Sequence, residues 1–185
     1  MSKPFRPTRE QLAAAIHQTV PDLIAPNLKV LFVGINPGLY SAATRRHFAR
    51  PGNRFWPALY AGGFTDRILS PFENQELLKH GYGVSNFVRR ATNAADELTK
   101  DELIAGAKSL ARKIKKFKPK IVAILGVGSY RIAFNKPDAK VGRQEEKIGD
   151  SVVWVLPNPS GLNAHFIPSK LAVLFRQLKE ESDLL

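Results

Sequence analysis

Four short apolar runs, each closed by a turn that contains glycine or proline or by a polar loop, constrain the fold of this chain more than any other feature. They span residues 28–33, 82–88, 120–125 and 152–156. Runs of this length, rich in β-branched and aromatic residues, are typical of strands buried on both faces of a sheet. Helical patterns lie between them, so the sequence predicts an α/β domain with a parallel sheet covered on both sides.

Capping patterns place the helices between these strands. Thr8 with Gln11 precedes an expected helix over residues 12–19, and Thr99 with Glu102 precedes a helix that continues to Lys118. Asn53 is expected to cap a helix through residue 61, and a further helix is expected over residues 71–81. The last helix is amphipathic, with one apolar face formed by Leu171, Leu174, Phe175 and Leu178. Residues 135–149 are polar and are expected to form a surface excursion.

The whole chain is consistent with one domain over residues 1–185, in which residues 1–26 form an N-terminal helical extension. Its 28 Lys and Arg residues against 16 Asp and Glu residues give a net charge of +12, which favours an anionic partner, either nucleic acid or an acidic membrane surface. Because cysteine is absent and the 4 histidines are scattered, we expect no metal centre and no cofactor. No apolar run is long enough for a membrane span or a signal core, so we expect a cytoplasmic protein without a membrane partner. We also expect a monomer.

The first strand is followed by a stiff turn, Gly34-Ile35-Asn36-Pro37-Gly38, which places Asn36 at the carboxyl end of the strand. Ligands bind at this edge in open α/β sheets. Four arginines follow within ten residues and are interleaved with His47, Phe48, Phe55 and Trp56: Arg45, Arg46, Arg50 and Arg54. A short polar side chain followed by aromatic residues among cations indicates a base held beside a phosphate backbone, although Phe55 and Trp56 are expected to be core residues.

A second loop, PNPSGLNAHF at residues 157–166, follows the last strand and is expected to face Asn36 across a cleft. Leu162 is the only large aliphatic side chain in it. An apolar side chain on a rigid tip suits a wedge into a base stack. A place in the hydrophobic core is an equally good interpretation of Leu162.

Two other basic or glycine-rich segments have plainer interpretations. The helix after Thr99 carries a basic face, which we interpret as a solubilising surface rather than a DNA contact: Lys108, Arg112, Lys113, Lys115 and Lys116. The GVGS turn at residues 126–129 lacks the glycine and lysine positions of known phosphate loops, so it is interpreted as a tight strand-to-helix turn. A hydrolase of a small phosphorylated metabolite is therefore disfavoured.

Taken together, GINPG at residues 34–38 and NPSGL at residues 158–162 resemble the two motifs of the mismatch-specific uracil/thymine DNA glycosylases, in the uracil-DNA glycosylase superfamily. The likeness extends through FARPGNRFW, GGFTDR, YGVSNFV and IVAILG, over roughly residues 26–180. It implies a three-layer α/β/α sandwich with a short, mainly parallel sheet of four to five strands. It also implies a monofunctional glycosylase, initiating base excision repair, that flips uracil out of duplex DNA where it is mispaired with guanine. Thymine and other modified pyrimidines are further candidate substrates.

The resemblance also implies roles for individual residues. Asn36 would position the attacking water, Ile35 and Phe48 would frame the base pocket, and Phe48 would stack on the flipped base. Further members of the pocket and its loop would be Gly38, Ser41, His47, Asn53 and Asn86. Ser160, Gly161 and Leu162 would fill the gap in the duplex and contact the opposing guanine.

Two departures from the relatives affect this assignment. Ala164 stands where some relatives have an arginine in the wedge loop, and His165 could partly substitute for it. Asn158 stands where related families have a histidine that polarises the base carbonyl, which points to the weaker, mismatch-directed branch. His47 is then either an alternative donor to the base or a solvated loop histidine.

Cleavage of an N-glycosidic bond passes through an oxocarbenium-like sugar, and the neutral Asn36 can orient a water but cannot be a strong base. Slow turnover is expected. A catalytically inert DNA-binding module with the same fold is the alternative, and it would bind DNA without releasing a base.

Overall fold

The computed structural model describes residues 5–161 and 167–185. Within these residues a single sheet has the strand order β2-β1-β3-β5-β4. Four strands are parallel and buried along their whole length, namely β1 (Val30–Gly34), β2 (Tyr82–Asn86), β3 (Ile121–Leu125) and β5 (Ser151–Leu156). The predicted α/β class and the four parallel strands are confirmed.

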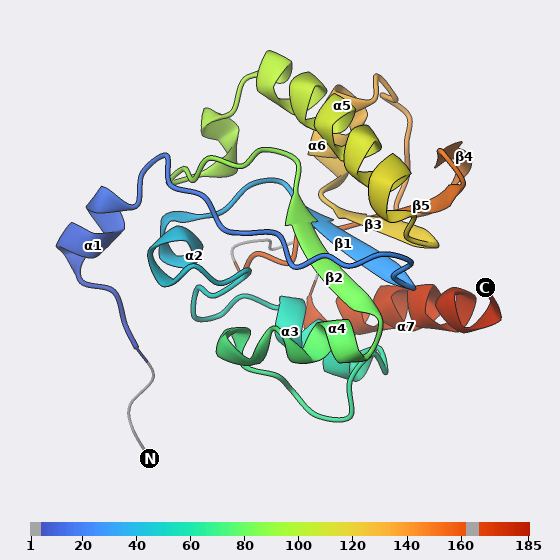
Figure 1. Cartoon of the computed structure of the whole chain (residues 1–185), viewed down its shortest axis with the longest axis horizontal. Coiled ribbons are helices and arrows are strands. Elements are labelled where there is room, and N and C mark those ends of the chain that lie inside the picture. Colours follow the sequence, from blue (N-terminus) through green and yellow to red (C-terminus); the bar gives the residue numbers. More distant parts are fainter. Residues whose placement is uncertain (1–4, 162–166) are drawn as a thin grey trace.

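Helices cover both faces of the sheet and form a three-layer sandwich (Figure 1). On one face, side chains such as Phe32, Ile121 and Trp154 pack against α3 (Phe55–Ala61), α4 (Glu76–Lys79) and α7 (Pro168–Leu184). On the other face, alternate strand residues pack against α5 (Lys100–Phe117) and α6 (Val127–Ala133). Phe55 and Trp56 are buried in the first of these layers, as predicted.

The remaining helices are short. They are α1 (Arg9–Ala14), α2 (Leu39–Thr44) and the two 3-10 turns η1 (Pro71–Glu73) and η2 (Ala95–Glu97). The capping boxes at Thr8, Ser70 and Thr99 are all present. The helix expected over residues 12–19 spans Arg9–Ala14 instead: it starts directly after the Thr8 cap and ends at the Ala15 C-cap, before the backbone becomes left-handed at His17. The helix expected over residues 71–81 is divided into η1 and α4, and α2 was not predicted.

The expectation of a surface excursion over residues 135–149 is wrong in part, because β4 (Gly142–Ile148) pairs antiparallel with β5 at the sheet edge. Four of its residues are charged and exposed, namely Arg143, Glu145, Glu146 and Lys147, so the apolar alternation that marks a buried strand is missing. Charges on an edge strand also oppose pairing with other chains.

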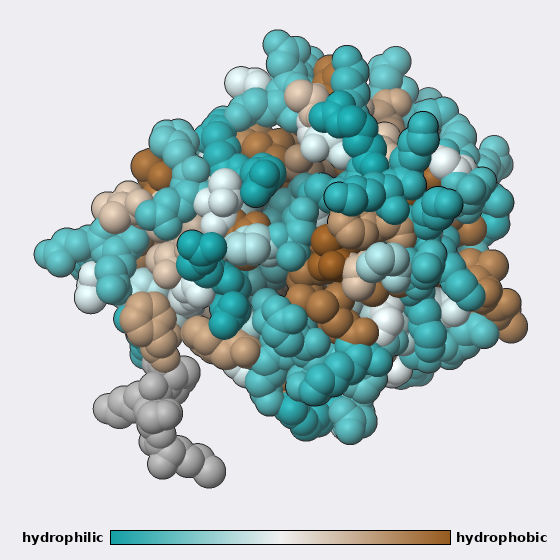
Figure 2. Space-filling model, viewed as in Figure 1, coloured by the Kyte–Doolittle hydropathy of each residue, from teal (hydrophilic) through white to brown (hydrophobic). Residues whose placement is uncertain are grey.

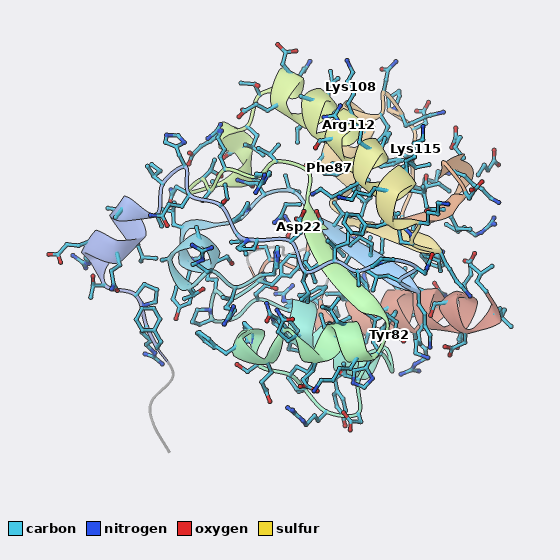
Figure 3. All side chains as sticks on the ribbon, in the orientation of Figure 1. Asp22, Tyr82, Phe87, Lys108, Arg112 and Lys115 are labelled. Carbon is cyan, nitrogen blue, oxygen red and sulfur yellow. The ribbon has the colours of Figure 1, made fainter. Side chains whose placement is uncertain are left out.

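The basic face of α5 projects outward, as the labelled Lys108, Arg112 and Lys115 show (Figure 3). Lys113 differs from the solubilising role expected of it: its Nζ lies 2.6 Å from Asp22 Oδ2 and donates to Ser85 Oγ at 2.7 Å. Hydrophilic residues cover most of the face seen in Figure 2. No helix among the described residues is long and apolar enough to cross a bilayer.

Candidate active site

A cleft of about 240 Å3 opens at the carboxyl ends of the parallel strands. Strand β1 pairs with β2 on one side and with β3 on the other, so the chain reverses its direction of winding there. Such a switch point leaves a crevice beyond the strand ends. Gly34, Asn86 and Leu125 line the cleft from the ends of these three strands, and Asn158 and Ser160 line it from the loop after β5. The expected cleft between the two loops is therefore present.

Ten of the residues proposed from the sequence line this one cleft: Ile35, Asn36, Gly38, Ser41, His47, Phe48, Asn53, Asn86, Asn158 and Ser160. Gly161 lines a smaller hollow beside it, together with Arg50, Asn53 and Ser160. Leu162, Ala164 and His165 lie outside the described residues. The roles suggested for all of these residues remain predictions.

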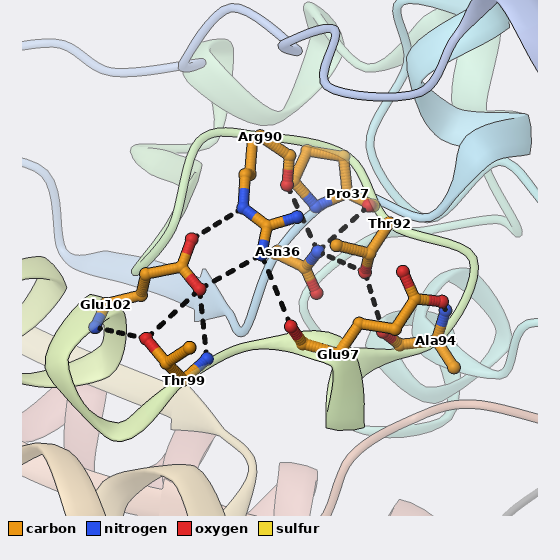
Figure 4. Close-up of polar contacts among 8 residues, drawn as sticks. All are labelled: Asn36, Pro37, Arg90, Thr92, Ala94, Glu97, Thr99 and Glu102. Carbon is orange, nitrogen blue, oxygen red and sulfur yellow. Dashed lines mark hydrogen bonds and ion pairs between the residues drawn. The ribbon is translucent and has the colours of Figure 1, made fainter.

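Hydrogen bonds donated by its nitrogen atom hold the carboxamide of Asn36 in place (Figure 4). Nδ2 donates to Thr92 Oγ1 at 2.7 Å, to the Arg90 carbonyl oxygen at 3.1 Å and, at 3.3 Å, to the Pro37 carbonyl oxygen. The Thr92 hydroxyl donates its own proton to the Ala94 carbonyl oxygen at 2.7 Å, so toward Asn36 it can only accept. Three acceptors around one end of the amide fix which end is nitrogen.

Asn36 Oδ1 accepts no hydrogen bond from any described residue. The side chain is partly exposed and lines the cleft. A fixed amide oxygen in a solvent-accessible cleft can accept a hydrogen bond from a water molecule and orient it.

Gly34 brings two cleft side chains into close contact with the end of β1. A Cβ atom at this position would lie 2.5 Å from Asn86 Oδ1 and 3.2 Å from Phe48 Cζ. The Phe48 ring also stacks, tilted, on Phe55 with 4.2 Å between ring centroids, and its backbone is left-handed with φ 52°. Such a conformation is uncommon for a bulky residue. The cleft therefore has one aromatic wall beside one amide.

His47 is almost fully buried, with 2% of its surface exposed. Its Nε2 lies 2.9 Å from the Pro21 carbonyl oxygen, which can only accept, so Nε2 carries the proton and Nδ1 accepts from Asn86 Nδ2 at 3.4 Å. Burial lowers the pKa of His47 below its ordinary value and keeps the ring neutral. Neither sequence-based interpretation of His47 fits: the ring is not solvated, and its proton is already donated to Pro21.

Two further polar residues hold the loop that carries His47 and Phe48. Ser41 Oγ accepts from the Ala49 N–H at 3.1 Å, and Asn53 Oδ1 accepts from the Phe55 N–H at 2.9 Å. The second bond joins Asn53 to the first residue of α3, but the N-cap residue of this helix is Arg54, whereas the sequence predicted Asn53. The first contact holds the residue directly after Phe48, and the second lies where the loop meets α3.

The loop after β5 is attached to the same segment. Arg54 donates through Nη2 to the Gly161 carbonyl oxygen at 3.1 Å and through its backbone to the Pro159 carbonyl oxygen at 2.9 Å. A Cβ atom on Gly161 would lie 2.5 Å from the Gly52 carbonyl oxygen, so only glycine permits this approach. Asn158 Oδ1 accepts from the Ser160 N–H at 3.0 Å.

The sequence interpretation missed the side of the cleft formed by the loop after β2. Thr92, Asn93, Ala94 and Ala95 line it, and Arg50 is a further lining residue of the cleft. The signal was available, because this loop also follows the carboxyl end of a parallel strand. Among the described residues, no group of three or more His, Cys, Asp or Glu side chains could hold a metal ion.

Comparison with known proteins agrees with this architecture. The structure is similar to a solution NMR structure of a Methanosarcina acetivorans protein with a proposed uracil DNA glycosylase assignment. The TM-score is 0.57 at 18% identity, over 89% of this chain and 99% of the other, so this likeness concerns the fold. The family model of the uracil DNA glycosylase superfamily matches residues 21–179. This chain therefore belongs to the uracil DNA glycosylase superfamily.

Proposed function

We propose that this protein is a monofunctional DNA glycosylase that hydrolyses the N-glycosidic bond of uracil mispaired with guanine in duplex DNA. The observation that carries the proposal is the fixed carboxamide of Asn36, whose nitrogen is bound by three acceptors while its oxygen is available in the cleft. Superfamily membership supports the choice of uracil as the base.

The groups in the cleft complement a flipped uracil. The Phe48 ring offers a stacking surface, and Asn86 offers an amide whose oxygen and second N–H match the N3–H and O4 of the base. His47 accepts one Asn86 proton and so fixes which end of that amide is nitrogen. A neutral His47 adds no charge that would compete with these contacts.

In the proposed reaction the bond between C1′ and N1 breaks first, and its electron pair leaves with the base as a uracil anion. The water held by Asn36 Oδ1 then adds to the oxocarbenium carbon, and its proton passes to solvent. Donors such as Asn86 Nδ2 stabilise the anion. No described lysine lines the cleft, which supports hydrolysis without a Schiff-base intermediate.

Selectivity for mispaired uracil follows from the flipping step. Extruding a base costs the least when its pairing is already weak, so a uracil opposite guanine enters the cleft more readily than one opposite adenine. The net charge of +12 and the exposed Arg45 and Arg50 supply attraction to the phosphate backbone.

The test is base release under single-turnover conditions from three duplexes that hold uracil opposite guanine, uracil opposite adenine or thymine opposite guanine. Abasic sites are revealed by alkaline cleavage. We expect release from the first duplex to be fastest. Equal rates from both uracil duplexes would contradict the mismatch preference, and no release from any duplex would contradict glycosylase activity.

A further inference from the structure

We propose that Thr92 is a positioning residue for Asn36: its hydroxyl group selects the orientation of the amide that presents oxygen to the cleft. This inference rests on the proposed glycosylase function and adds a residue from outside both sequence motifs. Thr92 follows β2 at a separation of 56 residues from Asn36, and its side chain makes the shortest of the three hydrogen bonds to Asn36 Nδ2, at 2.7 Å.

Thr92 is fixed in its role as an acceptor. The side chain is 1% exposed, and its hydroxyl proton is bound by the Ala94 carbonyl oxygen at 2.7 Å. Its backbone N–H donates to the Pro37 carbonyl oxygen at 3.2 Å, and residue 92 forms a parallel bridge with Gly38. The hydroxyl oxygen is thus held beside Asn36 by contacts with Ala94 in its own loop and with Pro37 and Gly38 in the turn after β1.

The alternative orientation of the Asn36 amide is strongly disfavoured by these neighbours. Rotating the amide by half a turn would place Oδ1 against the carbonyl oxygens of Arg90 and Pro37 and against the hydroxyl oxygen of Thr92. It would also present the NH2 group to the cleft, where it would repel the proton of a water that must approach with its O–H. Two of the three acceptors are backbone atoms, so Thr92 is the one contributed by a side chain.

A second layer of contacts holds the loop that carries Thr92 (Figure 4). The Arg90 guanidinium binds Glu102 at the start of α5 with Nε–Oε1 2.5 Å and Nη2–Oε2 3.0 Å, and it reaches the Glu97 carbonyl oxygen at 3.3 Å. The Glu97 carboxylate accepts from the Ala94 N–H at 3.0 Å. The hydrogen bonds from Arg90 lower the pKa of Glu102 to about 2, so this carboxylate stays ionised at neutral pH. The loop is thereby anchored to the longest helix of the domain.

Thr92→Val removes the hydroxyl group and preserves the shape of the side chain. We expect the single-turnover rate at saturating enzyme on the duplex with uracil opposite guanine to fall about tenfold, as for the loss of a hydrogen bond that orients a reacting group. The enzyme concentration that gives half this rate should stay unchanged, because Thr92 acts on the reaction step. Thr92→Ser keeps the hydroxyl and should restore most of the rate.

Thr65→Val is the matched control. Thr65 is also a buried threonine, with 7% of its surface exposed, and it lies outside the cleft. Its hydroxyl donates to the Arg67 carbonyl oxygen at 2.8 Å. This variant should lose stability without a change in rate. If Thr92→Val destabilises the fold too far, Thr92→Ala removes the same hydroxyl and is judged by the same two quantities.

The outcomes separate this inference from the proposed function. If the wild type releases the base and Thr92→Val does so at the same rate, the role of Thr92 is refuted, whereas the proposed glycosylase function stands. Equal losses in the Thr92 and Thr65 variants, or failure of Thr92→Ser to recover the rate, would show a structural role alone. No release by the wild type would overturn the proposed function and this inference together.

Discussion

At the scale of single residues, the packing of the cleft depends on Gly34, which has no Cβ atom. Gly34 ends β1, and a Cβ atom there would lie 2.5 Å from Asn86 Oδ1 and 3.2 Å from Phe48 Cζ. Both side chains would have to move out of positions that are fixed by other contacts, Asn86 by His47 and Phe48 by Phe55. The first glycine of the GINPG motif, Gly34, thus allows Asn86 and Phe48 to pack closely against the end of β1.

Gly34→Ala should therefore reduce base release from the duplex with uracil opposite guanine by about a hundredfold, since a displacement of about 1 Å can have that effect on a reaction step. Binding to the same duplex without uracil should change little. Gly128→Ala is the matched control, because a Cβ at this helical glycine meets no atom within 4 Å. A Gly34→Ala protein with the wild-type rate would refute the packing argument.

His47 provides a test of the buried pocket through pH. Burial lowers its pKa in the folded protein, so below the ordinary value of 6.5 the unfolded chain binds more protons than the folded one. The stability associated with neutral His47 is fully present above pH 6.5 and is lost as the pH falls from there through the lowered pKa.

We therefore expect urea unfolding midpoints to fall more steeply between pH 7 and pH 5 in the wild type than in His47→Gln, which can still donate to the Pro21 carbonyl oxygen. His17 and His80 are exposed and are common to both proteins, so the difference isolates His47. Identical pH profiles would mean that His47 is not buried in solution as it is here.

At the scale of secondary-structure elements, the segment before β1 is held to α5 and β2 by a partly buried polar cluster. Asp22 Oδ2 lies 2.6 Å from Lys113 Nζ, and Asp22 Oδ1 accepts from the buried Ser85 Oγ at 2.8 Å. The neighbouring Pro21 supplies the carbonyl that binds His47, and Leu23 forms a bridge with Val84 of β2. Through these contacts, the segment holds His47 and β2 in place beside the pocket.

Lys113→Met should lower the free energy of unfolding by about 1–3 kcal/mol, because it removes the cation that is paired with the Asp22 carboxylate in a partly buried site, where only the hydrogen bond from Ser85 remains. Lys115→Met changes an exposed lysine two residues further along the same helix and should have an effect within about 0.5 kcal/mol. Urea denaturation of both variants measures the difference. Equal values would contradict a stabilising role for the cluster.

The elements that the sequence predicted correctly are those whose pattern is local. The four buried strands have continuous apolar runs, and α5 has both a capping box and one apolar face. Strand β4 and helix α2 lack such patterns: β4 is a charged edge strand, and α2 has only six residues. Neither could be distinguished from a loop without knowledge of the strand that β4 joins or the segment that α2 packs against.

The same distinction between local patterns and long-range contacts applies to the residues of the cleft. Residues in the two motifs could be assigned from the sequence because they directly follow strands and contain stiff turns. The loop that carries Thr92 could have been assigned to the cleft in the same way, but the contact of Thr92 with Asn36 and the burial of His47 against Pro21 could not, since each joins residues more than 20 positions apart. Long-range side-chain contacts of this kind leave no periodic signal in a single sequence.

At the scale of the whole molecule, the net charge of +12 should make DNA binding strongly dependent on salt, but not every basic residue should contribute. Arg50 is exposed beside the cleft, whereas Lys108 lies on the outer face of α5 (Figure 3). Arg50→Gln should reduce the slope of log K against log salt concentration by about 0.9, the value for one phosphate contact. Lys108→Gln should leave the slope unchanged; equal reductions in both variants would assign α5 to the DNA interface.

The central claim is that Asn36 orients the water that hydrolyses the glycosidic bond, and its most direct test is a comparison of Asn36→Ala with the wild type on one duplex that holds uracil opposite guanine. Two quantities are measured, the single-turnover rate of base release and the dissociation constant for the same duplex carrying an uncleavable uracil nucleotide. We predict that the rate falls by at least about a hundredfold while the dissociation constant changes less than about threefold. Release at the wild-type rate by Asn36→Ala, or tight binding without release by the wild type, would contradict the claim, and the second result would identify a DNA-binding module without catalytic activity.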